Sequence, residues 1–116
     1  MKVMFISDLH GSYYWANKAI EKYHEEKADN LIILGDILYH GPRNDLPKDY
    51  NCKKVIALLN PLKKDIIAVR GNCDSEVDQM VLDFPMRSDY ALMDVDQHHF
   101  FMTHGHLFNE DQLPLL

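Results

Sequence analysis

Cysteine is scarce in this chain, and so is any long apolar run. Its 116 residues include only two cysteines, Cys52 and Cys73, with no C-x-x-C spacing, which excludes a disulfide framework and favours a reducing cytoplasm. No apolar run approaches the roughly 20 residues that a membrane-spanning helix needs. The apolar start at residues 1–6 is too short for a signal peptide, so we interpret it as a first strand. We therefore expect no membrane association.

Basic residues are also few. Twelve Lys and Arg stand against 18 Asp and Glu, for a formal net charge of −6. This balance excludes a general nucleic-acid coat protein, because binding to a phosphate backbone needs a basic stripe. A phosphorylated substrate remains compatible, since bound divalent cations reverse the local field. The length predicts that residues 1–116 form a single domain.

Apolar runs alternate with segments of helical spacing. We expect strands at 2–6, 30–34 and 65–69, helices at 13–27 and from 51 or 52 to 60, a helical turn from 75, and adjacent strands at 90–95 and 98–102. Residues 37–50 are expected to form a loop. The alternation predicts an α/β fold with a parallel β-α-β start, followed by an antiparallel strand pair. The second strand is continuously apolar, which is typical of burial on both faces.

Four of the expected strands end in polar residues. These ends are Asp8-Leu9-His10, Gly35-Asp36, Gly71-Asn72-Cys73-Asp74 and His104-Gly105-His106. Ligands bind beyond the carboxyl ends of parallel strands, so we expect all four ends to converge on one edge of the sheet. Their oxygen and nitrogen donors suit Mn²⁺, Zn²⁺, Fe or Ni. Two such cations clamp a phosphate and acidify a water molecule between them. The pattern therefore predicts a metal site.

The order of these motifs resembles the calcineurin-like metallophosphoesterases, whose pattern is Asp-x-His, Gly-Asp, Gly-Asn-x-Asp/Glu, a lone His and then Gly-His-x-His. The stretches 7–12, 34–38, 40–44, 70–80 and 103–108 look most like the YfcE-type bacterial phosphodiesterases in that family. The resemblance implies a metallophosphoesterase-like layered α/β sandwich. It also implies hydrolysis of small phosphodiesters, in which a metal-activated water attacks phosphorus and no protein nucleophile is needed.

The resemblance implies that the chain binds two divalent ions. Manganese is the first expectation, and zinc, iron or nickel are the alternatives. Asp8, His10 and Asp36 would serve the first ion, with Asp36 as the bridge. Asn72 and His104 would serve the second.

Two departures from the family pattern concern the leaving-group acid and the end of the chain. Many members carry a histidine, proposed as that acid, where Cys73 stands. A thiol is a poorer acid, which suits substrates with good leaving groups or leaves the role to Asp74, a nearby imidazole or water; Cys73 and Asp74 are the candidate catalytic residues. After His106 only ten residues remain, none of them histidine, and the Gly-His-x-His motif is not found. With the apolar end at 112–116, this leads us to expect about the N-terminal two-thirds of a longer domain, without its last strands and with weak activity.

The loop after Asp36 supplies candidates for substrate contact. Arg43 would hold a phosphate oxygen through its planar fork, with Asn44 beside it; the alternative is a surface loop fixed by local hydrogen bonds. His106 is a further candidate. We expect one of His98 and His99 to point inward and the other outward, with neither a ligand.

Two other interpretations stay open at this stage. Trp15 is expected to pack in the core or to contact a partner, rather than to stack on a base. The alternative function is a non-catalytic scaffold that binds a protein partner, as the retromer subunit of the same fold does. An exposed sheet edge would also favour self-association into a homo-oligomer.

Overall fold

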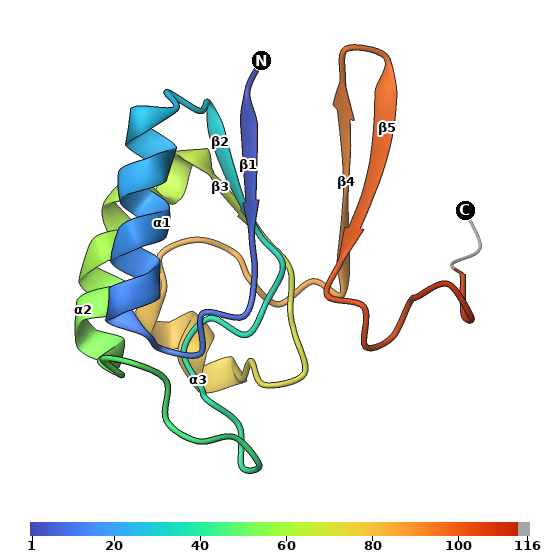
Figure 1. Cartoon of the computed structure of the whole chain (residues 1–116). Helices are drawn as coiled ribbons and strands as arrows, with labels where there is room; N and C mark the ends of the chain where they lie inside the picture. The colour runs from blue at the N-terminus through green and yellow to red at the C-terminus, as the bar shows by residue number, and fades with distance from the viewer. Residues whose placement is uncertain (114–116) are drawn as a thin grey trace.

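A parallel sheet forms the body of the molecule. The computed structural model describes residues 1–113, so the part of the apolar end at 114–116 lies outside it. Strands β1 (Val3–Ile6), β2 (Asn30–Ile33) and β3 (Ile66–Ala68) pair in parallel in the order β1-β2-β3 (Figure 1). The last residues of the three strands, Ile6, Ile33 and Ala68, stand opposite one another in the register. The strands therefore end at the same edge, as the sequence predicted.

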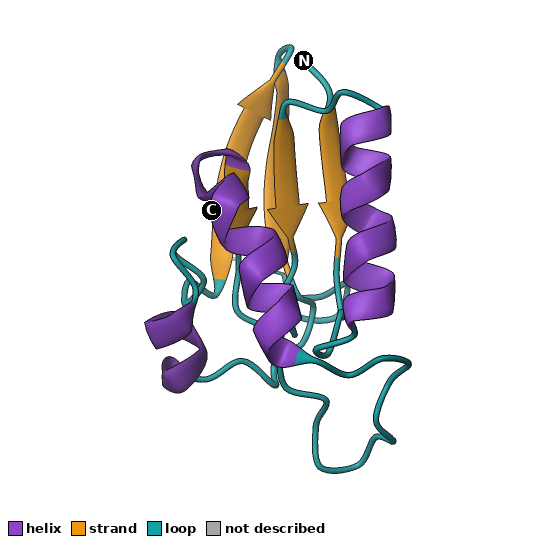
Figure 2. Cartoon of the chain, turned by 90° about the vertical axis from the view of Figure 1, so that its left-hand side faces the viewer, coloured by secondary structure: helices purple, strands orange, loops and turns teal. Residues whose placement is uncertain are grey.

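Two helices cover one face of this sheet (Figure 2). Helix α1 (Tyr13–Glu25) begins after Ser12, whose hydroxyl accepts from the Trp15 amide, and α2 (Cys52–Leu59) begins after Asn51, which caps it in the same way. Both caps satisfy an amide that the helix leaves unpaired. None of the helices in the described range 1–113 is long and apolar enough to cross a membrane.

Strand β2 is the centre of the core. Leu31 and Ile33 pack in the main apolar cluster with the helices, and Ile32, which points to the opposite face, is also completely buried. Burial on both faces explains why this strand lacks the polar alternation of a half-exposed one. The prediction for this strand is confirmed.

The chain reaches β3 through an element that the sequence did not predict. A 3₁₀ helix, η1 (Asn60–Asp65), follows α2 directly, with Pro61 in its first turn. Proline is accepted there because its missing N–H would have no partner inside the helix. The 3₁₀ helix uses Asp65, so β3 is shorter than the expected strand 65–69.

The last two strands form a sheet of their own. β4 (Tyr90–Val95) and β5 (His98–Thr103) make an antiparallel hairpin beside β1, turning at Asp96 and Gln97 with φ of 49° and 69° (Figure 1). Two positive φ angles match the turn that fits strand twist in two-residue hairpins. The four polar strand ends, which were expected to converge on one edge of a single sheet, therefore leave two sheets. Three belong to the parallel sheet, and the fourth follows the hairpin.

The hairpin and the start of α1 correct two further expectations. His98 and His99 are both exposed, so neither side chain points into the core. Trp15 is 55% exposed and meets the ring of Tyr14 edge-on at 4.9 Å between centroids. It is therefore not a core residue, and its role as a partner contact remains a prediction.

Candidate metal centre

The loops after β1 and β2 lie side by side beyond the sheet. The amide of Asp8 donates to Gly35 O at 3.0 Å, and that of His10 donates to Asp36 O at 2.8 Å. Asp8, His10 and Asp36 have φ of 58°, 49° and 55°, a region that few residues other than glycine adopt. These sharp turns bring the side chains of both loops to the same edge.

Asp36 lies at the centre of the group and is only 2% exposed. Its Oδ1 accepts from the Cys73 amide at 2.8 Å, and its Oδ2 lies 3.2 Å from His104 Nε2 and 3.6 Å from His10 Nε2. Burial raises the pKa of this carboxyl above its usual value, against the opposing effect of the Cys73 amide and His104. A carboxylate in this setting gains from a cation close to it.

Both imidazoles are oriented by backbone carbonyls. Nδ1 of His10 donates to Tyr39 O at 2.8 Å, and Nδ1 of His104 donates to Leu34 O at 2.7 Å. A carbonyl only accepts, so Nδ1 carries a proton and Nε2 is the ring nitrogen that faces the centre. Histidine ligands are held for metals in this way.

The remaining two predicted ligands complete the cluster. Asp8 Oδ1 lies 3.3 Å from His10 Nε2, and Asn72 Oδ1 lies 3.0 Å from His104 Nε2. The ligand atoms of Asp8, Asp36 and His104 all lie within 4.8 Å of one another. The structure thus brings all five predicted ligands together. The facing atoms are carboxylate, amide and imidazole oxygen and nitrogen atoms, which are ligand types that divalent cations bind.

Asp74 serves the backbone around the centre. This buried carboxylate accepts from the amides of Asp36 at 2.7 Å, Ile37 at 3.1 Å and Gly71 at 2.7 Å. It therefore ties the loop after β2 to the loop after β3. Three donors facing one carboxylate leave no acceptor for a proton on it. The arrangement speaks against the predicted role as a proton donor and gives Asp74 a positioning role.

A cleft of about 650 Å³ opens beside the centre. Its lining includes Arg43, Asn44, Asn72 and Cys73, so the predicted substrate residues and the predicted acid face the same space. The Arg43 side chain is exposed, while Asn44 Nδ2 donates to His40 O at 2.8 Å. This hydrogen bond fits the alternative of a surface loop fixed by local hydrogen bonds. The contact of Asn44 with substrate stays a prediction.

Cys73 is a half-buried thiol on the inner side of this cleft. Burial raises its pKa, and the negative charges of Asp36, Asp74 and Asp8 raise it further. The thiol is therefore protonated at neutral pH and has a proton to give.

His106 lies behind His104, with 5.3 Å between the ring centroids. Neither ring nitrogen has a hydrogen-bond partner within residues 1–113. Burial lowers the pKa of His106, and the positive charges of His104 and Arg70 lower it further. The ring supports His104 from outside the ligand set, and its predicted contact with substrate remains a prediction.

Sequence reasoning missed the contacts that hold His104 against the body. Arg70 donates through Nε and Nη2 to Asp89 Oδ1 at 3.1 and 2.8 Å, and its amide donates to Ser88 O at 2.8 Å. Thr103, the residue before His104, donates its hydroxyl to Asp89 O at 3.1 Å. We call these contacts the Arg70–Asp89 brace. In the sequence, Arg70 directly before Gly71 was the one signal of these contacts, and it did not indicate Asp89 as the partner.

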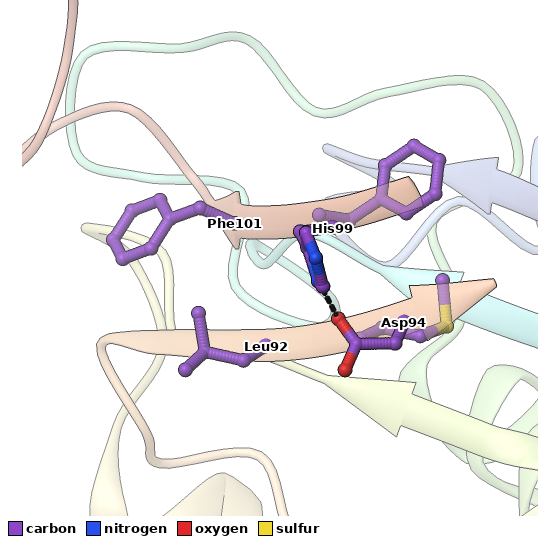
Figure 3. Close-up of a pocket in the computed structure, with 6 residues that line it drawn as sticks. Leu92, Asp94, His99 and Phe101 are labelled. Carbon is purple, nitrogen blue, oxygen red and sulfur yellow. Dashed lines mark hydrogen bonds and ion pairs between the residues drawn. The ribbon is translucent and has the colours of Figure 1, made fainter. Parts of the chain in front are cut away.

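A second hollow lies on the hairpin and is separate from the centre. It measures about 430 Å³ and is lined by Leu92, Phe101 and their neighbours, with a contact between His99 and Asp94 across the strands (Figure 3). None of the predicted ligands lines it. It is an apolar surface hollow rather than part of the metal centre.

Comparison with known proteins identifies the family. The family model described as the calcineurin-like phosphoesterase superfamily domain matches residues 1–115. Phosphodiesterase YfcE of Escherichia coli is 48% identical over 116 residues, all of this chain and 63% of that protein. A phosphodiesterase of Methanocaldococcus jannaschii is 29% identical over 112 residues, 91% of this chain and 60% of that protein.

Solved structures show the same likeness. The structure of the E. coli YfcE phosphoesterase matches with a TM-score of 0.97 at 48% identity, over 100% of this chain and 64% of that one. An archaeal phosphodiesterase structure matches with a TM-score of 0.64 at 27% identity, over 91% of this chain and 60% of that one. The chain thus spans somewhat less than two-thirds of these relatives. It belongs to the calcineurin-like phosphoesterase superfamily.

Proposed function

We propose that this chain is a metal-dependent phosphodiesterase that hydrolyses small phosphodiesters at the centre around Asp36. The observation that carries the proposal is the orientation of His10 and His104. In each ring, Nδ1 donates a hydrogen bond to a backbone carbonyl, and Nε2 faces the buried carboxylate of Asp36. Metal-binding histidines are oriented in this way, by a hydrogen bond from the ring nitrogen that does not bind the metal.

We infer two places for divalent ions, which would share Asp36. Asp8 and His10 stand on one side, and Asn72 and His104 on the other. Two divalent cations bound there would supply Lewis acidity toward phosphate oxygens and would acidify water at neutral pH. We propose manganese as the resident ion, because the five predicted ligands are oxygen and nitrogen donors.

The cleft residues would bind the phosphodiester and protonate its leaving group. Arg43 is positioned to bind a non-bridging phosphate oxygen through its guanidinium, and Asn44 to orient the ester beside it. Cys73 holds the proton that a leaving alkoxide needs. A thiol is a modest acid, so we propose substrates with good leaving groups, such as aryl phosphodiesters. The two free cysteines support a reducing cytoplasm as the place of action.

Metal binding and turnover together test the proposal. Mn²⁺ binding is measured by titration calorimetry on the metal-free protein, and hydrolysis of a bis-aryl phosphate is followed in the same samples. Asp36→Asn is expected to lose both. Asp94→Asn, an exposed aspartate on the hairpin, is the matched control and is expected to keep both. Turnover that survives Asp36→Asn, or no divalent-cation binding at millimolar concentration, would refute the proposal.

The same measurements separate the enzyme from a scaffold. Turnover decides between them, because a scaffold that keeps these ligand residues binds Mn²⁺ without hydrolysing the ester. Binding of Mn²⁺ to the native state stabilises it by an amount that rises with the logarithm of free Mn²⁺ once its concentration exceeds the dissociation constant. We expect the melting temperature to rise with Mn²⁺ for the unchanged chain and to stay constant for Asp36→Asn.

A further inference from the structure

Cys73 is placed as a metal donor as well as a cleft residue. Its Sγ and the ligand atoms of His10 and Asp36 all lie within 4.8 Å of one another. This group differs from the group of Asp8, Asp36 and His104 in having a sulfur donor. The two groups share only Asp36, so the thiol lies on the His10 side of the bridging carboxylate.

The backbone of Cys73 is fixed beside the centre, and the sulfur is half-buried there. The Cys73 amide donates to Asp36 Oδ1 at 2.8 Å, which fixes the residue beside its co-ligand. On the opposite side, a Cβ added to Gly41 would lie 3.2 Å from Sγ, so the 40–44 loop closes over the sulfur. The sulfur therefore faces a space bounded by the loop and by two other donors.

We propose that Cys73 is a metal-selective ligand, which coordinates soft divalent cations such as Cd²⁺ and Zn²⁺ together with His10 and Asp36 and leaves hard cations such as Mn²⁺ to the oxygen and nitrogen donors. The inference rests on the proposed metal centre. Thiolate favours soft cations, and carboxylate and imidazole serve both kinds. On coordination the S–H bond breaks, the metal–sulfur bond forms and the proton passes to solvent.

Cys73 cannot serve at once as a metal ligand and as the proton donor to the leaving group. A thiol that has become a ligand has no proton left for a leaving group. Soft cations are therefore expected to occupy the centre tightly while supporting less turnover than Mn²⁺. The centre would thus sense which metal fills it.

Cobalt spectroscopy tests the assignment without reference to turnover. Co²⁺ added to the metal-free protein is expected to give visible d–d bands and a near-ultraviolet thiolate charge-transfer band. Cys73→Ser is expected to keep the d–d bands and lose the charge-transfer band. Cys52→Ser, whose Sγ donates to Leu38 O at 3.4 Å away from the ligand groups, is the matched control and is expected to keep both.

The outcomes separate this inference from the proposed function. Visible d–d bands without a charge-transfer band in the unchanged chain overturn the role of Cys73 and leave the metal centre standing. A charge-transfer band that persists in Cys73→Ser does the same. Absence of all d–d bands overturns the metal centre itself, and with it this inference.

A second measurement needs no variant. Alkylation of the unchanged protein is followed at each cysteine by mass spectrometry. Cd²⁺ is expected to protect Cys73 by about tenfold or more in rate, which a bound fraction above nine-tenths produces, while Mn²⁺ leaves it reactive. Cys52 reports general changes in accessibility and is expected to react alike in all samples. Equal protection of Cys73 by Mn²⁺ and Cd²⁺ would contradict selectivity.

Discussion

The parallel sheet and the β4–β5 hairpin supply the same centre but are built differently. In β2 three consecutive residues are completely buried, whereas in β4 Tyr90 is 44% and Leu92 63% exposed. The sheet contributes four of the five predicted ligands through loops tied by backbone hydrogen bonds. The hairpin contributes only His104. The parallel sheet, with its buried strand and tied loops, therefore sets most of the geometry of the centre. The position of His104 depends on how the more exposed hairpin is attached to the sheet.

The largest expected effect concerns the core of the sheet. Leu31→Ala removes a completely buried side chain and is expected to lower the free energy of unfolding by about 2–5 kcal/mol. Leu92→Ala, on the exposed hairpin, is expected to change it by about 0.5 kcal/mol or less. Urea unfolding measures both. Similar losses for the two variants would show that the hairpin is packed as tightly as the sheet.

Glycines next to the ligands extend the comparison to the centre. A Cβ at Gly71 would collide with Asp36 Oδ1 and lie 2.8 Å from the Asp36 amide, whereas at Gly105 no atom lies within 4 Å. Gly71→Ala is expected to weaken Mn²⁺ binding by about 10–100-fold, the usual loss when support of a ligand fails. Gly105→Ala is expected to affect stability alone, through its φ of 103°. Calorimetric titration checks both, and equal affinities would refute the prediction.

The attachment of the hairpin is tested at the Arg70–Asp89 brace. The two side chains are 34% and 47% exposed, so Arg70→Ala is expected to cost less than about 1 kcal/mol of stability. Arg70→Ala is expected to reduce Mn²⁺ affinity more than it reduces stability. The reason is that the brace positions Thr103, and through it the neighbouring ligand His104. Arg87→Ala, from a more exposed pair with Glu76, is the control and should leave binding unchanged.

The smallest effect is a pH dependence from the hairpin end. The pKa of His106 lies below its ordinary value of 6.5, through burial and then His104 and Arg70. The unfolded chain takes up this proton more readily, so stability is full above pH 6.5 and falls as the pH drops toward the folded-state pKa. His106→Gln should flatten that part of the profile of urea midpoint against pH in the metal-free protein. An unchanged profile would contradict it.

The sheet could be predicted from sequence because its causes are local. The apolar run at Leu31–Ile33 and the caps at Ser12 and Asn51 each depend on neighbouring residues, and all are found in the structure. The polar strand ends could be placed because parallel strands end at one edge.

The rest depends on contacts between distant residues. Asp74 forms hydrogen bonds to amides 37 and 38 residues away, and no pattern around it indicates that its carboxylate serves as an acceptor. The brace joins Arg70 to Asp89 across 19 residues. His98 and His99 were misjudged because alternation tells which side a residue takes, but not whether anything covers that side.

The left-handed backbone at Asp8, His10 and Asp36 has an evolutionary consequence. Each such residue costs about 1–2 kcal/mol that glycine would not, so drift toward glycine would make this fold more stable at the expense of its ligands. Under the proposed function, the aspartates and the histidine at these positions therefore give up part of the stability that glycine would provide in exchange for the donor atoms of the metal centre.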